Sequence, residues 1–265
     1  MSYRRARLCA YPGRSKGDEV AEDDLALRQA RGKLWLPRKP VTTLKQAGAY
    51  VARHGLALLF PAPGTVVPSL WEAVAGEDAV PFATGMEENE TRVWTWKDEL
   101  PKVGLAWSGK FLYRRASLLA PDVLALLYSG SGEPTDHRDL ELSRDAHDLA
   151  EALGPGPLPT ATLRQLVGDK SRYEKAIAEL HRSLLVTSAG TTEQRSGWPA
   201  VLVDLTCRVF DVGGRADPAA AAARFARTAI SATPRDLARA YGWPVKRADH
   251  ELKFLVDGGS RTPSS

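Results

Sequence analysis

Residues 156–186, GPLPTATLRQLVGDKSRYEKAIAELHRSLLV, carry the strongest structural pattern in the chain. The Pro-rich opening is typical of a turn, and ATLRQLVG predicts a short helix that ends at Gly168. KSRYEKAIAELHRSLLV predicts a longer helix, because apolar residues recur in it at helical spacing. Four residues form that apolar face: Tyr173, Ile177, Leu180 and Leu184. A short and a longer helix joined by a tight turn indicate a helix–turn–helix.

The segments on either side extend this unit to a winged helix. SRDAHDLAEALG, which starts at Ser143, predicts an amphipathic helix before the turn. LLVTSAG and PAVLVDL predict two strands around the polar tip TTEQRSG. Helix, short helix, longer helix and β-hairpin, in that order, are the elements of a winged helix–turn–helix.

The same order of elements begins again after the linker GGRADP. AAAAARFARTAIS predicts a strong helix, and TPRDLARAYG repeats the cap, Pro and short helix of the first unit. WPVKRADHELKFLVDGG predicts the longer helix, and the remaining residues leave no room for a wing. The second helix–turn–helix is therefore expected to be truncated.

The predicted fold class is α+β and mainly helical, with tandem winged helix–turn–helix units and a small β-containing N-terminal module. Residues 1–40 have a local net charge of +5 and are expected to be a basic, disordered tail. The stretch DDLALRQARGKLWL near its end is compatible with a short helix. Residues 41–142 form the predicted N-terminal α/β module, residues 143–212 the winged helix, and residues 213–265 the second unit.

Composition excludes several classes of protein. The 265 residues are 43% hydrophobic with a net charge of +4, so a sizeable core is expected. No apolar run approaches the length of a membrane span, and the first residues lack the apolar segment of a secretory signal. The two cysteines, Cys9 and Cys207, favour a reducing cytoplasm over a disulfide framework. Zinc-ligand spacing and phosphate-binding glycine loops are missing, so we expect no metal and no cofactor.

The stretch VWTWKDELP, residues 93–101, is the candidate site outside the helix–turn–helix units. Its β-branched and aromatic residues predict a strand, in which Trp94, Trp96 and Asp98 share one face and Lys97 points away. Indole rings around a carboxylate would raise its pKa, which suits acid–base chemistry. Asp98 and Lys97 are therefore the candidate catalytic residues, and Trp94 and Trp96 could stack on an extruded base. The same residues also fit a structural role, with the indoles in the core and the charges paired.

Several segments together resemble a known family. They are GPLPTATLRQLVG, RYEKAIAELHRSLLV, PSLWEAVAG, WTWKDEL and WSGKFLYRRASLLAPDVLALLY. They are similar to the AlkZ-related winged-helix proteins, distant relatives of the bacterial YcaQ/AlkZ crosslink-repair DNA glycosylases, over roughly residues 42–256. The resemblance implies a DNA repair function and a candidate DNA glycosylase activity. The four glutamines, Gln29, Gln46, Gln165 and Gln194, do not begin the Gln–apolar–Gln or Gln–apolar–Asp motif of those enzymes, so base release would use other residues.

Basic residues on the helix–turn–helix units are candidates for DNA contact, because a recognition helix brings its N-terminal residues close to phosphates and base edges. Six residues lie there or at the tip of the predicted wing: Lys170, Arg172, Lys175, Arg195, Lys246 and Arg247. Acidic residues on the same helices, such as Glu174 and Asp249, also fit a solvated surface. Three functions stay open: a DNA repair protein that binds double-stranded DNA, a non-enzymatic transcriptional regulator, and a protein-interaction module.

Overall fold

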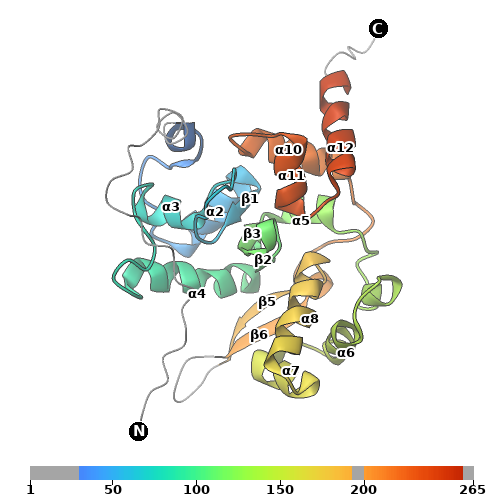
Figure 1. The fold of residues 1–265 in the computed structure, drawn as a ribbon. Coiled ribbons are helices and arrows are strands. Elements are labelled where there is room, and N and C mark those ends of the chain that lie inside the picture. Colours follow the sequence, from blue (N-terminus) through green and yellow to red (C-terminus); the bar gives the residue numbers. More distant parts are fainter. Residues whose placement is uncertain (1–29, 193–199, 259–265) are drawn as a thin grey trace.

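The computed structural model describes residues 30–192 and 200–258, and Figure 1 shows their arrangement. The chain is mainly helical and contains two antiparallel sheets of three strands each, which confirms the α+β class. The first sheet has the order β1–β3–β2, with strands Leu56–Leu58, Ala116–Leu119 and Trp107–Lys110. The second sheet has the order β4–β6–β5, with strands Leu158–Pro159, Val201–Leu205 and Val186–Thr191. No helix in the part of the chain that the structure describes is both long and apolar enough to span a bilayer.

Local signals in the sequence explain where the helices of the N-terminal part begin and end. α2 (Leu44–His54) and α3 (Leu70–Ala75) each begin with a capping box, at Thr43 and Ser69, and each ends at a glycine. Three further helical segments follow β2: η1 (Leu112–Arg114), α5 (Pro121–Leu127) and η2 (Asp136–Asp139). α5 carries Pro121 in its first turn, where a missing N–H costs no hydrogen bond.

The stretch VWTWKDELP is helical, so the predicted strand is wrong. It forms most of α4 (Glu88–Lys102), and Pro101 lies within its last turn. Val93, Trp96 and Leu100 recur at intervals of three and four residues, and all three are buried in one apolar cluster. Packing of this face therefore overrides the β propensity of the individual residues.

The first sheet separates two apolar cores. Alternate residues of β1 point to opposite faces, so Leu56 and Leu58 enter one core while Ala57 enters the other. The smaller core lies under α2, α3 and α4, and the larger one continues through Trp107 into the C-terminal half. The N-terminal module and the following units are therefore packed on one shared sheet.

The C-terminal half builds on the second sheet and on two groups of helices (Figure 1). α6, α7 and α8 precede the strands β5 and β6, and α9 to α12 follow them. Their bounds are Arg144–Ala152, Thr160–Val167, Lys170–Arg182, Thr206–Val209, Pro218–Thr228, Pro234–Tyr241 and Val245–Gly258. α4 packs along β5, which joins the N-terminal module to the second sheet.

Residues 30–35 are helical and pack on the rest of the chain. Trp35 is buried, and its Nε1 donates a hydrogen bond to the carbonyl oxygen of Thr228 at 2.7 Å. Arg31 forms an ion pair with Glu72 at 3.1 Å. The last part of the expected tail therefore belongs to the folded structure, because Trp35 has an apolar site and a hydrogen-bond acceptor there.

Candidate nucleic-acid interface

Helix α8 presents one apolar and one polar face. The side chain of Asp169 caps the helix, accepting a hydrogen bond from the backbone N–H of Arg172 at 2.8 Å. The inner face, which packs in the larger core, consists of Tyr173, Ala176, Ile177 and Leu180. The opposite face holds Ser171, Lys175, Ala178 and Arg182. This outward face has the position and the charge needed to contact a ligand in solution.

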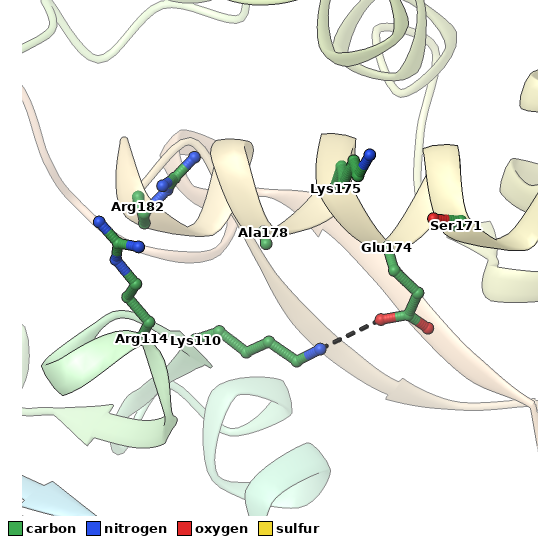
Figure 2. Close-up of a pocket in the computed structure, with 7 residues that line it drawn as sticks. All are labelled: Lys110, Arg114, Ser171, Glu174, Lys175, Ala178 and Arg182. Atoms are coloured by element: carbon green, nitrogen blue, oxygen red, sulfur yellow. Dashed lines mark hydrogen bonds and ion pairs between the residues drawn. The ribbon is translucent and has the colours of Figure 1, made fainter.

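A cleft of about 330 Å³ runs along the outward face of α8. The other wall comes from the end of β2 and the short helix η1 of the N-terminal module. Seven residues line this α8 cleft: Lys110, Arg114, Ser171, Glu174, Lys175, Ala178 and Arg182. Figure 2 shows Lys110 extending along the cleft to Glu174, with Arg114 and Arg182 at its other end. Side chains from two distant segments therefore meet in one site.

The α8 cleft carries four cationic side chains and one carboxylate. Glu174 accepts a hydrogen bond from Lys110 Nζ at 3.1 Å and lies 3.8 Å from a guanidinium nitrogen of Arg164. Within the described residues, the side chains of Arg114, Lys175 and Arg182 take part in no ion pair. Unpaired cations on facing walls repel one another, and an anion between them relieves this repulsion. The site is therefore suited to a phosphate-bearing ligand.

His181 holds α8 against β2 behind this cleft. Its ring meets Trp107 edge to face, with centroids 6.1 Å apart. A Cβ on Gly109 would lie 2.7 Å from His181 Cδ2, so only glycine allows this close approach. Burial, and then the charges of Lys110 and Lys97, lower the pKa of His181 to about 3. The imidazole is therefore neutral near pH 7 and adds no charge to the site.

Two of the candidate DNA contacts on α8 are exposed and form no ion pair with any residue in the described ranges 30–192 and 200–258. Lys175 lines the cleft, and Lys170 is exposed at the first position of the helix. Arg172 is exposed as well, but its Nε donates to Asp145 on α6 at 2.9 Å. The structure therefore brings Lys175 into the cleft and directs Arg172 toward α6.

The other candidates lie away from the α8 cleft. Lys246 and Arg247 are exposed in the first turn of α12, and the Arg247 guanidinium lies 4.3 Å from the centroid of the Trp243 ring. Arg195 lies outside the described residues. Sequence reasoning missed Arg182, Lys110 and Arg114 as members of the site. Arg182 lies eleven residues after Ser171, which puts both on one helical face. This spacing could have identified Arg182 from the sequence.

Asp98 is buried, and both of its oxygens are engaged. Oδ2 accepts a hydrogen bond from Lys97 Nζ at 2.6 Å, and Oδ1 accepts one from Ser188 Oγ at 2.8 Å. The Lys97 ammonium lies 5.0 Å from the centroid of the Trp94 ring. The predicted face shared by the two indoles is wrong, because residues two apart on a helix point in different directions: Trp94 is 42% exposed and Trp96 only 6%. The structure thus brings Asp98, Lys97 and Trp94 together and places Trp96 in the core.

The family model of AlkZ-related proteins matches residues 41–240. Among solved structures, the chain is similar to Streptomyces sahachiroi DNA glycosylase AlkZ, with 16% sequence identity and a TM-score of 0.47. That similarity covers 87% of this chain but 64% of the other, so it spans less than two thirds of the AlkZ structure. A search of curated proteins finds no match. Because the family model covers most of the residues, this chain belongs to the AlkZ-related family.

Proposed function

We propose that this protein binds double-stranded DNA through α8, with residues 143–212 acting as a winged helix and residues 213–265 as a second, truncated helix–turn–helix. The order α6, α7, α8 and then the antiparallel pair β5 and β6 supports the first unit. α10, α11 and α12, with a capping box at Thr233 and a left-handed Gly242, support the second.

One observation carries the proposal: Lys175 and Arg182 on α8 line the same cleft as Arg114 on η1, and none of the three forms an ion pair with a residue that the structure describes. A DNA backbone supplies the anion that these groups lack, and each phosphate contact releases bound counterions. Glu174 lies among these cations and is already neutralised by Lys110 and Arg164. It therefore repels a phosphate much less than a free carboxylate would.

The test is anisotropy binding of the full chain to a labelled duplex at two salt concentrations. We expect Lys175→Gln and Arg182→Gln each to weaken binding about five- to tenfold at low salt and to reduce the salt slope by about 1. Arg144→Gln on α6 is the matched control, because this side chain is 94% exposed and lies outside the cleft. Duplex binding with the same affinity in all four proteins would remove α8 from the interface.

Membership in the AlkZ-related family supports a more specific function than DNA binding alone, namely DNA repair with release of an altered base. Asp98 and Lys97 stay the candidate catalytic residues. The buried Asp98 carboxylate is paired with Lys97, whose ammonium lies 5.0 Å from the centroid of the exposed Trp94 ring, and this arrangement favours the candidate. The test compares Asp98→Asn with the parent on a duplex that holds a bulky alkylated base. Loss of base release with intact duplex binding supports the assignment, and equal release by both proteins excludes Asp98.

Two other functions would give different results in these assays. A transcriptional regulator would select one sequence from a mixture of duplexes and would not distinguish an altered base from a normal one. A protein-interaction module would bind no nucleic acid even at low salt. A preference of more than about tenfold for an abasic or alkylated duplex over an intact one, about 1.4 kcal/mol, would favour the repair function over both.

A further inference from the structure

We propose that the segment 110–115 carries a second phosphate-binding site, between Arg115 and Arg239, and that Arg114 joins this site to the α8 cleft. One DNA backbone would then run from α8 across this segment to α11. The inference rests on the proposed DNA binding and extends it to a surface that belongs to neither recognition helix.

The second site is a cleft of about 240 Å³. Its lining comes from the loop after β1, from the segment between β2 and β3, and from α11: Pro63, Thr65, Tyr113, Arg114, Arg115 and Arg239. Three of these side chains are cationic and none is acidic. Arg114 lines both clefts, so the two sites share a wall and form one continuous basic track.

The backbone of this segment is strained where it presents the arginines. Tyr113 and Arg114 have φ values of +52° and +59°, in the left-handed region that L side chains rarely adopt. Such a conformation costs on the order of 1 kcal/mol or more per residue, and strained residues concentrate at functional sites. Turns of this kind usually use glycine or asparagine, whereas this chain keeps a tyrosine and an arginine.

Buried groups on either side hold the strained turn in place. Leu112 is fully buried, and Ser117 Oγ accepts hydrogen bonds from the backbone N–H groups of Phe111 and Leu112 at 3.3 and 3.1 Å. The hydroxyl of Tyr113 accepts one from the N–H of Val66 at 3.3 Å. The exposed guanidinium groups therefore project from a fixed backbone, which lowers the entropy lost when they bind a ligand.

Arg239 completes the second cleft from the side of α11. A Cβ on Gly64 would lie 3.4 Å from its guanidinium, which places the side chain over the loop after β1. The nearby carboxylate of Asp236 is occupied, since it accepts hydrogen bonds from Ser231 Oγ at 2.6 Å and Thr233 Oγ1 at 2.7 Å. Arg239 forms no ion pair with any residue that the structure describes, so its charge is available to an anion.

Because the two clefts share a wall, we expect their ligand to be one polyanion rather than separate small ions. A DNA strand carries one phosphate for about every 3.4 Å of helix axis, so neighbouring sites can bind successive phosphates of one strand. Arg114 lies between the two clefts and would contact the phosphate at which the DNA backbone passes from the α8 cleft to the second cleft. Inorganic phosphate carries a similar charge, but its ions are not linked to one another as the phosphates of a DNA strand are. The experiment therefore has to distinguish binding of free phosphate from binding of DNA.

The experiment measures duplex affinity and its salt slope for the full chain with Arg115→Gln, Arg239→Gln and Arg182→Gln, and with Arg144→Gln as control. We expect each of the first three to weaken binding about five- to tenfold and to reduce the slope by about 1, and Arg239→Lys to restore the slope. Inorganic phosphate at a concentration equal to that of the DNA phosphates should compete poorly. Equivalent competition would overturn the continuous track.

The outcomes separate this inference from the proposed function. If Arg115→Gln and Arg239→Gln bind like the parent while Arg182→Gln is weakened, the second site is wrong and α8 still binds DNA. If the parent binds no duplex at low salt, the proposed function itself is wrong. All these side chains are exposed, so unchanged thermal unfolding confirms that each variant is folded.

Discussion

The hydroxyl of Ser188 on β5 donates a hydrogen bond to the Asp98 carboxylate on α4 at 2.8 Å, and both residues are buried. Lys97 neutralises the other oxygen of the same carboxylate. This polar contact lies where α4 packs along β5, so it connects the N-terminal module with the sheet that follows α8. Because the α8 cleft has one wall from each part, the relative position of its walls depends on this junction.

We expect Ser188→Ala to lower the free energy of unfolding by about 1–3 kcal/mol, because it leaves a buried carboxylate oxygen without its donor. Urea denaturation of the full chain measures the change. Ser171→Ala is the control, since Ser171 is exposed on α8 and should change the stability by less than about 0.5 kcal/mol. Equal stability of Ser188→Ala and the parent would show that the hydrogen bond contributes nothing.

The two tryptophans of α4 should respond differently to substitution. Trp96 is packed in the smaller core, so Trp96→Ala is expected to cost about 3–5 kcal/mol of unfolding free energy. Trp94 is partly exposed and stacks on Phe60 with ring centroids 6.5 Å apart, so Trp94→Ala should cost about 1 kcal/mol or less. Denaturation of the two variants side by side checks this, and similar losses would contradict the helical placement of the pair.

If Trp94 stacks on a nucleic-acid base, its fluorescence should be quenched by DNA that holds an abasic site or an altered base. The difference in emission between the parent and Trp94→Phe isolates this indole from the other tryptophans. We expect the difference signal to fall on addition of such a duplex, because the Trp94 ring is accessible. If no duplex changes this difference in emission, Trp94 does not stack on a base and its role is structural.

Local signals made most of the helices predictable from the sequence. The capping residues Thr43 and Ser69, the apolar face of α8 and the left-handed Gly168 all act within a few neighbouring residues. The β propensity of the stretch around Trp94 and Trp96 predicts a strand wrongly, because the residues that precede it belong to the same helix. α4 extends back to Glu88, and its buried face becomes visible only over the full length of the helix.

The α8 cleft was only half predictable. Lys175 is visible in the sequence as a basic residue on the predicted recognition helix, and the structure places it in the lining of the cleft. Lys110 and Arg114 lie about sixty residues earlier in the chain, so only packing of β2 on α8 brings them there. No periodicity or spacing in a single sequence carries that information.

Acid should destabilise the protein through two histidines whose pKa values are lowered in the folded state, His181 and His54. Burial lowers the pKa of His181 to about 3 and that of His54 to about 4, both below the ordinary value of 6.5. The unfolded chain therefore binds more protons than the folded one between pH 6.5 and these values, so stability falls as the pH drops through this range. Each histidine contributes at most about 1.4 kcal/mol per pH unit.

Urea denaturation at pH 7.5 and pH 5.0 measures this effect. We expect the parent to lose stability over this interval, His181→Leu to lose less, and the double variant with His54→Leu to lose least. The comparison uses the change between the two pH values, so a constant effect of the leucine on packing cancels. A His181→Leu variant with the parent's pH dependence would show that His181 titrates normally in the folded protein.

Arg114 should show opposite effects on stability and on binding. Arg114→Gly removes the strain of φ +59°, on the order of 1 kcal/mol, although the greater freedom of glycine in the unfolded chain offsets part of this gain. Arg114→Ala removes the same charge and keeps the strain. Both variants should therefore lose about five- to tenfold in DNA affinity, while Arg114→Gly should be more stable than Arg114→Ala by less than about 1 kcal/mol. Urea denaturation and duplex anisotropy on the same samples test both parts. If the glycine variant is more stable than the alanine variant and both bind DNA like the parent, the strain at this turn does not serve DNA binding.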